Sequence, residues 1–302
     1  TVTMRNITVI RNGAIGDFTL TLPAIHSIHK AFTDINLQLI GQPNNIQLCQ
    51  VNLQVSYDDP RLTPLHRTGP IPQETRDLFV DTERILVYAV DSERQLERQL
   101  TQLSIGPVLF CDPRPPADAS VHIVDHLLSP LQTWNIPPAR RSPHIELNPK
   151  DYRYAETLPS MPDVVIHPGS SSPDKCWPEQ HFCALAAQLA KRGWATAIIC
   201  GPIEIERGLV GDSLQPPNLR SLAGLLSCAS LFIGNDSGPG HIAAAVGTPT
   251  LSLFGPTDPR IWAPRNTRAK VLLAPTKNID EIPLEIVFEA ALQLLESRHD
   301  ER

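Results

Sequence analysis

The chain has 302 residues, a net charge of −6, 41% hydrophobic residues and 19% charged residues. This length is enough for two ordinary domains with their own cores, and the composition is typical of globular proteins and argues against disorder. The acidic balance lacks the basic excess of nucleic-acid-binding proteins, so we expect no nucleic-acid partner.

Targeting and cysteine signals predict a cytoplasmic location. The sequence contains no uninterrupted run of about 18 apolar residues, which a membrane-spanning helix would need. The first residues, 1–6, lack the apolar segment of a secretory signal and lead into a strand pattern. The six cysteines show no CxxC spacing, so we expect free thiols in a reducing compartment and no structural zinc site.

The N-terminal half begins with an apolar strand pattern at Ile7–Arg11. The turn NGAIGD follows and places Asp17 at the start of an apolar helical pattern that continues to Phe32. This turn lacks the third glycine of a dinucleotide-binding loop and the GK[ST] end of a Walker loop, which argues against both. Asp17 is therefore either a helix N-cap or a functional carboxylate at the carboxyl end of a parallel strand, where open α/β sheets bind ligands.

Alternating strand and helix patterns in the rest of this half predict a parallel sheet. We expect strands at 37–41, 84–90 and 108–111, helices at 44–51, 92–103 and 119–134, an irregular loop at 57–73 and a proline-rich linker at 135–162. His122 and His126 lie four residues apart on one expected helix. They could be two ligands of a metal, but no third ligand is evident, so we expect them to pack or hydrogen-bond.

The C-terminal half repeats the alternation. We expect strands at 164–167, 195–200, 231–234 and 250–254, and helices at 178–193, 222–229, 241–246 and 283–296. Three strand-end loops, 168–175, 201–206 and 235–241, should then lie along one edge of a parallel sheet, where a nucleotide fits. In them Ser171 and Ser172 can donate to phosphate oxygens, and Lys175 can neutralise the charge. Glu204 or Glu206 can accept from ribose hydroxyls.

The segment 229–264 is the most informative part of the chain. It reads as strand, loop, helix, strand and loop, and its first loop offers Asp236 and Ser237 as cap candidates and Gly238 as a point of close approach. The amino end of the following helix favours an anion, so we expect a phosphate there. The alternative is an ordinary βαβ unit whose glycines serve only tight turns.

Four motifs together resemble the heptosyltransferase-like glycosyltransferases of family 9. They are RNGAIGDFTLTLP at 11–23, SSSPDKCWP at 170–178, GPIE at 201–204 and GNDSGPGHIAAAVGTPTLSLFGPTDP at 234–259. The resemblance implies an α/β fold of GT-B type, in which two Rossmann-like domains with parallel sheets face across a cleft. The N-terminal domain, 1–158, would bind the acceptor, and the C-terminal domain, 159–302, the nucleotide sugar. The final helix could pack back on the N-terminal domain.

The resemblance also implies an activity, which is inverting, metal-independent transfer of a heptose from ADP-heptose to a hydroxyl of a glycan or lipopolysaccharide core. By position, Asp17 is similar to the catalytic base, and Lys175 would assist the leaving diphosphate. The implied donor-binding residues are Ser171, Ser172, Lys175, Glu204, Asp236, Ser237, Gly238 and His241, and the acceptor-binding candidates are Arg11, Arg61 and His122.

No cofactor or metal is expected besides the nucleotide-sugar co-substrate. A lipid-linked acceptor would bring the protein to the inner membrane surface as a peripheral protein, and the sequence does not predict an oligomeric state. A second interpretation is a non-catalytic nucleotide- or glycan-binding module of the same fold. The presence of Asp17 argues for the enzyme, and the missing GxGxxG turn argues against a Rossmann oxidoreductase.

Overall fold

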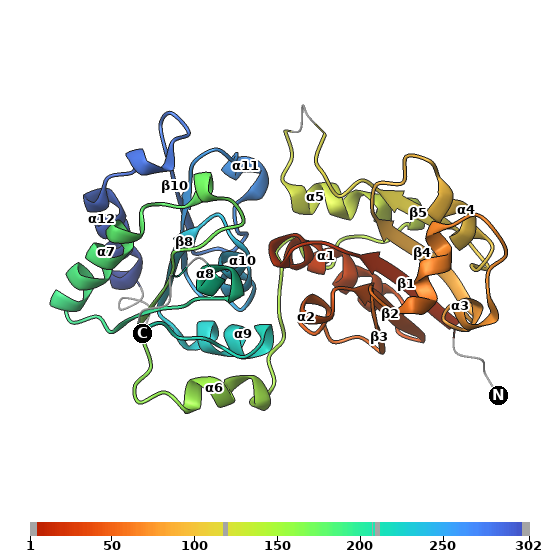
Figure 1. The fold of residues 1–302 in the computed structure, drawn as a ribbon, viewed down its shortest axis with the longest axis horizontal. Helices are drawn as coiled ribbons and strands as arrows, with labels where there is room; N and C mark the ends of the chain where they lie inside the picture. Colours follow the sequence, from red (N-terminus) through yellow and green to blue (C-terminus); the bar gives the residue numbers. More distant parts are fainter. Residues whose placement is uncertain (1–4, 117–119, 207, 209–211, 298–302) are drawn as a thin grey trace. The chain divides into compact units, whose positions relative to one another are not determined.

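The computed structural model describes residues 5–116, 120–206, 208 and 212–297. The chain forms two compact units, Thr1–Arg141 and Ser142–Arg302, each built on a parallel five-stranded sheet (Figure 1). The predicted α/β fold of GT-B type with two parallel sheets is confirmed. The division falls inside the expected linker at 135–162 and before the expected domain boundary at 158.

The N-terminal sheet has the strand order β3-β2-β1-β4-β5. Its strands are β1 (Arg5–Arg11), β2 (Ile35–Gly41), β3 (Leu53–Ser56), β4 (Thr82–Tyr88) and β5 (Val108–Cys111). The chain adds β2 and β3 on one side of β1 and then β4 and β5 on the other. The strand order therefore reverses between β1 and β4, which is where doubly wound sheets bind ligands.

Helices cover both faces of this sheet. They are α1 (Ile15–Ala31), α2 (Pro43–Ile46), η1 (Pro60–His66), α3 (Gln73–Asp77), α4 (Gln95–Thr101), α5 (Ile123–Leu128) and η2 (Ser129–Trp134). One core cluster joins strand residues Ile40 and Val87 to Leu65 of η1 and Leu100 of α4. Helices α1 and α5 pack against each other. These buried faces fix the turn between β1 and α1, and Asp17 lies in the first turn of α1.

The C-terminal sheet has the strand order β10-β9-β8-β6-β7. Its strands are β6 (Val164–His167), β7 (Thr196–Ile198), β8 (Leu231–Asn235), β9 (Thr250–Phe254) and β10 (Ala269–Leu273). The order reverses between β6 and β8, and their pairing runs in register to His167 opposite Gly234. The loops after these two strands thus begin side by side at the reversal point.

The C-terminal helices form layers on the two faces of this sheet. They are η3 (Pro149–Tyr152), α6 (Arg153–Glu156), η4 (Pro173–Lys175), α7 (Glu179–Lys191), α8 (Pro202–Glu206), α9 (Leu219–Cys228), α10 (Gly238–Ala245), α11 (Pro259–Trp262), η5 (Ile279–Glu281) and α12 (Leu284–Glu296). Figure 1 shows α7 and α12 on one side of the strands and α9 and α10 on the other. Within the described ranges, no helix combines the length and apolar character needed to cross a bilayer.

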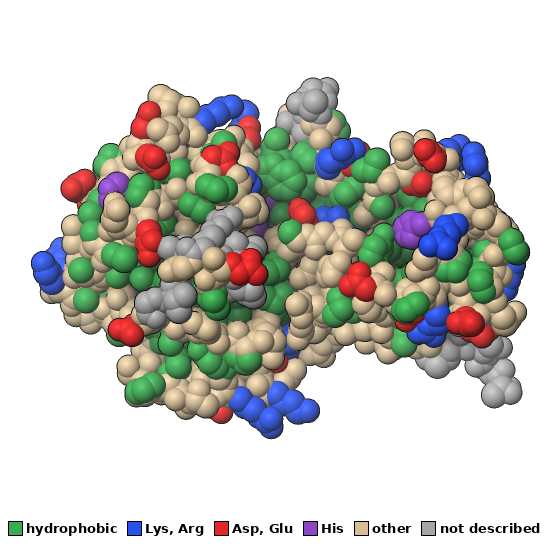
Figure 2. Space-filling view, in the orientation of Figure 1, with side chains coloured by type: hydrophobic (Ala, Val, Ile, Leu, Met, Phe, Trp, Pro, Cys, Tyr) green, Lys and Arg blue, Asp and Glu red, His purple; other side chains and the backbone are tan. Residues whose placement is uncertain are grey.

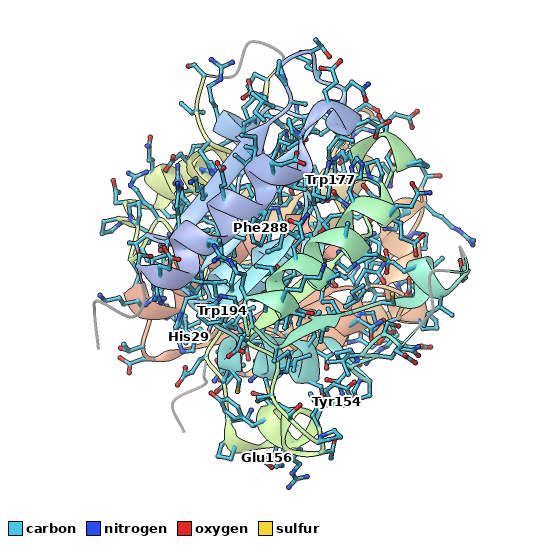
Figure 3. The ribbon with its side chains drawn as sticks, turned by 90° about the vertical axis from the view of Figure 1, so that its left-hand side faces the viewer. His29, Tyr154, Glu156, Trp177, Trp194 and Phe288 are labelled. Atoms are coloured by element: carbon cyan, nitrogen blue, oxygen red, sulfur yellow. The ribbon has the colours of Figure 1, made fainter. Side chains whose placement is uncertain are left out.

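The last described helix, α12, belongs to the C-terminal core. Its buried residues Val287, Ala291 and Leu295 cluster with Leu185 of α7, and the expectation that it could pack back on the N-terminal domain stays a prediction. Trp177 lies in the same cluster, is 1% exposed and donates its indole N–H to the carbonyl oxygen of Ile282 at 3.0 Å. In Figure 3 the aromatic residues of this region, Trp177, Trp194 and Phe288, are labelled around these two helices.

Several expected elements differ from the observed ones. Strands β3 and β10 were not predicted, and both are edge strands with few buried residues, so neither shows a buried apolar run. The expected helix at 119–134 is instead α5 followed by η2, because Pro130 has no N–H to continue the α-helix. Its expected first residue, Ala119, lies outside the described residues. The loop at 57–73 contains η1, and 201–206 contains α8.

The expected linker contains an ordered docking segment, formed by η3 and α6 on the surface of α9. Arg220 of α9 donates from Nε to Asp151 Oδ1 at 3.0 Å, and this ion pair is largely buried. Gly224 lies where the backbone of this segment approaches closest, since a Cβ there would come within 2.1 Å of the carbonyl oxygen of Asp151. A glycine in the middle of α9 therefore has a packing reason.

We predict that Gly224→Ala lowers the free energy of unfolding by about 1–3 kcal/mol, the usual cost of overpacking. Helix propensity alone predicts the opposite sign, because alanine is better than glycine in a helix interior by about 1 kcal/mol. Urea unfolding of both proteins measures the difference. A variant more stable than the wild type would show that Asp151 does not pack tightly on α9.

Candidate functional site

The loops after β6 and β8 are joined by direct hydrogen bonds. The hydroxyl of Ser170 donates to the carbonyl oxygen of Asp236 at 2.7 Å. The buried carboxamide of Asn235, 1% exposed, accepts from the backbone N–H of Trp177 at 3.0 Å and donates to the carbonyl oxygen of Pro168 at 2.7 Å. Sequence reasoning did not select Asn235, although a polar residue ending a buried strand pattern was a usable signal.

Lys175 and Asp236 form the central ion pair of this region. The Lys175 Nζ lies 3.1 Å from Asp236 Oδ2, and the two side chains are 24% and 10% exposed. The Thr257 hydroxyl donates to the same carboxylate oxygen at 2.8 Å. The pairing brings together two residues that were chosen from separate motifs. It also leaves the ammonium group with further N–H donors for an anion, because lysine has three.

The remaining candidates lie close in sequence to Lys175 or to Asp236. Ser171 is exposed, and the half-buried Ser172 precedes η4 and donates to Asp174. Gly238 is the first residue of α10, and Ser237 occupies the N-cap position before it. His241 lies inside α10 and is 4% exposed. The amino end of α10 thus follows directly after the ion-paired Asp236, and a helix amino end favours an anion.

Glu204 lies on α8 and is also buried, with 5% exposure. Its Oε2 accepts from the backbone N–H of Gly201 at 2.8 Å and lies 3.5 Å from His167 Nε2. Burial raises the pKa of Glu204, but the hydrogen bond and charge of His167, together with the Gly201 amide, outweigh it and lower the pKa to about 2. The carboxylate is therefore ionised at neutral pH. Gly169 leaves room for it, since a Cβ there would come within 1.9 Å of Oε1.

In the N-terminal unit, Asp17 is accessible at the start of α1. Ala14 is the N-cap, so Asp17 does not have that expected position; it accepts from the Ala14 N–H at 3.3 Å as the third helical residue. Its side chain is 41% exposed, and Oδ1 lies 3.9 Å from the Arg11 Nη2. The loop after β1 is fixed from α2, because Asn45 donates to the Gly13 carbonyl oxygen at 2.8 Å.

The structure gives internal partners to the acceptor candidates. Arg11 is 3% exposed and donates from Nε to the Thr21 hydroxyl at 3.1 Å. Burial lowers the pKa of its guanidinium, and the charge of Asp17 raises it. This position favours support of Asp17 over direct contact with an acceptor. Arg61 is paired with Asp59 at 2.7 Å on the surface.

The histidine pair of the N-terminal unit hydrogen-bonds, as expected. His122 is the N-cap of α5, and its Nδ1 accepts from the Val124 N–H at 3.2 Å. His126 Nε2 lies 2.7 Å from the carbonyl oxygen of Asp112 and 3.8 Å from Cys111 Sγ. Among the residues that the structure describes, no group of three or more His, Cys, Asp or Glu side chains is arranged to hold a metal ion.

Figure 2 shows the charged side chains on one face of the N-terminal unit. On the face of this unit seen in Figure 2, basic and acidic side chains are scattered among polar and apolar ones without forming one large patch of a single sign. The chemically distinctive groups are therefore local. They are an accessible carboxylate in the N-terminal unit, and a lysine, a helix amino end and buried carboxylates in the C-terminal unit. A carboxylate of this kind can accept a proton, and a lysine beside a helix amino end can stabilise a phosphate.

Comparisons with known proteins give matches in sequence and in fold. The model of glycosyltransferase family 9 (heptosyltransferase) matches residues 108–283. Lipopolysaccharide heptosyltransferase 3 of Escherichia coli K12 is 41% identical over 117 residues, which are 33% of this chain and 33% of that protein. Lipopolysaccharide heptosyltransferase 1 of Pseudomonas aeruginosa is 37% identical over 113 residues, 35% of this chain and 32% of that protein. The match thus spans about a third of these curated relatives.

Similar solved structures extend over nearly the whole chain. A glycosyl transferase of family 9 from Veillonella parvula has a TM-score of 0.77 at 19% identity, covering 98% of this chain and 99% of that one. The E. coli heptosyltransferase WaaC with ADP has a TM-score of 0.74 at 18% identity, covering 96% and 99%. At these identities the likeness establishes the fold.

The pH dependence of stability tests whether Glu204 is ionised in its buried pair with His167. Its folded pKa of about 2 lies below its ordinary value of 4.5, so its contribution to stability is present above about pH 4.5 and is lost as the pH falls toward 2. We predict that Glu204→Gln is less stable than the wild type at pH 7, by at most about 3 kcal/mol, and that the difference shrinks in acid.

Urea unfolding at pH 7 and at several acidic pH values measures this difference. Glu179→Gln, which removes an exposed carboxylate from α7 in the same unit, is the matched control and should change stability little. A Glu204→Gln difference that stays constant over the pH range would contradict the ionised pair.

Proposed function

The chain belongs to glycosyltransferase family 9, the heptosyltransferase family, and on that premise we propose that it transfers a heptose from ADP-heptose to a hydroxyl of a lipopolysaccharide-core acceptor. The substrates in this proposal are taken from the names of its relatives. The matching curated proteins are named lipopolysaccharide heptosyltransferases, and WaaC was solved with ADP and with ADP-2-deoxy-2-fluoro heptose.

The observation that carries the proposal is the arrangement of Lys175, Asp236 and the amino end of α10 at the reversal point of the C-terminal sheet. Open α/β sheets bind nucleotides at such points. In this proposal the diphosphate of the donor binds there, with Lys175, Ser171 and Ser172 as its contacts. Glu204 is the proposed ribose contact and would accept through Oε1, because Oε2 already accepts from the Gly201 N–H.

The proposed reaction is a single in-line displacement. The acceptor oxygen forms a bond to the anomeric carbon of heptose while the bond from that carbon to the diphosphate breaks on the opposite face, which inverts the configuration. Asp17 takes the hydroxyl proton as general base. The electron pair of the broken bond goes to the diphosphate, where Lys175 and the helix dipole stabilise the growing charge. Because these groups supply positive potential, we propose that no divalent metal is required.

We predict that Lys175→Ala weakens ADP binding by roughly 1.5–3 kcal/mol, the range for hydrogen bonds to charged groups. Removing the ammonium also leaves the Asp236 carboxylate without its cation beside the diphosphate. Titration calorimetry measures the loss, and Lys191→Ala, at the exposed end of α7, is the control that should bind normally. Equal affinities for all three proteins would remove Lys175 from the donor site.

For Asp17 we predict that the asparagine variant folds and binds ADP normally while turnover falls by about 10²–10⁴-fold, the usual contribution of a general base. Asparagine retains an oxygen that can accept from the Ala14 N–H, so the start of α1 is kept. Melting curves and a transfer assay are measured together, with the exposed Asp34→Asn as control. A fully active Asp17→Asn protein would refute the general base, and binding without turnover in the wild type would favour the non-catalytic module.

A further inference from the structure

The serine before α10 does not cap its own helix. Ser237 occupies the N-cap position with extended backbone angles of φ −156° and ψ 161°, but its side chain makes no capping hydrogen bond. Serine is among the preferred N-caps, because its oxygen usually accepts from an N–H of the first turn. Here Pro239 has no N–H to offer, and the Gly240 N–H bonds the carbonyl oxygen of Ser237 at 3.2 Å. The hydroxyl is directed elsewhere.

The partner of this hydroxyl is a buried histidine. His167 Nδ1 lies 3.3 Å from Ser237 Oγ, and the other ring nitrogen, Nε2, lies 3.5 Å from Glu204 Oε2. The side chains of His167 and Glu204 are 5% and 6% exposed. The three residues come from three different elements, the end of β6, α8 and the start of α10. A carboxylate at Nε2 orients the ring and sets which nitrogen carries a proton.

We propose that His167, oriented by Glu204, is a positioning residue of the donor site that holds the Ser237 hydroxyl away from the first turn of α10. The hydroxyl then does not compete with the donor diphosphate for the N–H groups of Gly238 and Gly240 at the amino end of the helix. This inference rests on the proposed donor site.

Two features of the structure support a dedicated arrangement. An ionisable pair with so little exposure loses its hydration on folding, and in some proteins such a pair is kept because it fixes a specific geometry. In addition, Gly169, two residues after His167, is the residue whose missing side chain makes room for Glu204. The β6 loop thus both carries the histidine and accommodates the carboxylate that orients it.

Titration calorimetry of the full chain with ADP and, separately, with inorganic pyrophosphate tests the proposal. Pyrophosphate has no ribose, so its affinity reports the anion site without the proposed ribose contact of Glu204. We expect His167→Gln to weaken both ligands by about threefold to tenfold, as for loss of one uncharged hydrogen bond. In a Ser237→Ala background the same substitution should have no further effect, because the two residues act as one unit.

Two further variants separate positioning from general loss of structure. His167→Asn places an amide atom at the level of Nδ1 and should keep most of the pyrophosphate affinity, whereas Glu204→Leu should lose it as His167→Gln does. Unchanged pyrophosphate affinity in His167→Gln, or an equal loss with and without Ser237, would overturn the proposal. A wild type that binds neither ligand would overturn the donor site itself, so the two failures are distinct.

Discussion

The carboxamide of Asn235 is the interaction on which the C-terminal site depends. Asn235 is the last residue of β8, at the reversal point of the sheet. Its carboxamide donates to the carbonyl oxygen of Pro168 in the loop after β6 and accepts from the N–H of Trp177, which lies just before α7. All of these groups are buried, so losing the carboxamide would leave backbone N–H and C=O groups without partners in an interior that penalises them. The buried carboxamide therefore holds in place the loops that carry Lys175, Ser170 and Asp236.

Charges at the site are arranged in pairs that differ in accessibility. Lys175 and Asp236 keep partial exposure, so the ammonium can exchange one of its contacts for a phosphate at modest cost. His167 is nearly closed to solvent and serves the geometry of the loop, whereas Glu204, equally buried, has Oε1 left for the proposed ribose contact. In the N-terminal unit, the carboxylate of Asp17 is exposed, whereas the guanidinium of Arg11 that lies next to it is buried. Accessibility thus distinguishes Lys175 and Asp17, which can meet a substrate, from His167, which positions a loop.

Sequence patterns predicted most of this because parallel strands buried on both faces read as apolar runs. The runs at 164–167, 231–234 and 250–254 coincide with β6, β8 and β9 almost to the residue. The edge strands β3 and β10 were not predicted, since an edge strand buries few side chains and shows no buried apolar run. Lys175 and Asp236 could be selected from their loops, but their pairing could not, because it depends on the register of β6 against β8. His167 and Thr257 act through tertiary contacts that no local spacing encodes, whereas Asn235 had a local signal as a polar residue at the end of a buried strand.

The most direct test of the central claim is a transfer reaction followed by mass spectrometry. The full chain is incubated with ADP-heptose and a panel of lipopolysaccharide-core acceptors truncated before successive heptoses. The proposed function predicts that one acceptor gains the mass of a single heptose and that ADP is released in equal amount. ADP-heptose that binds the chain yet leaves every acceptor unchanged would contradict it and indicate a binding module of the same fold.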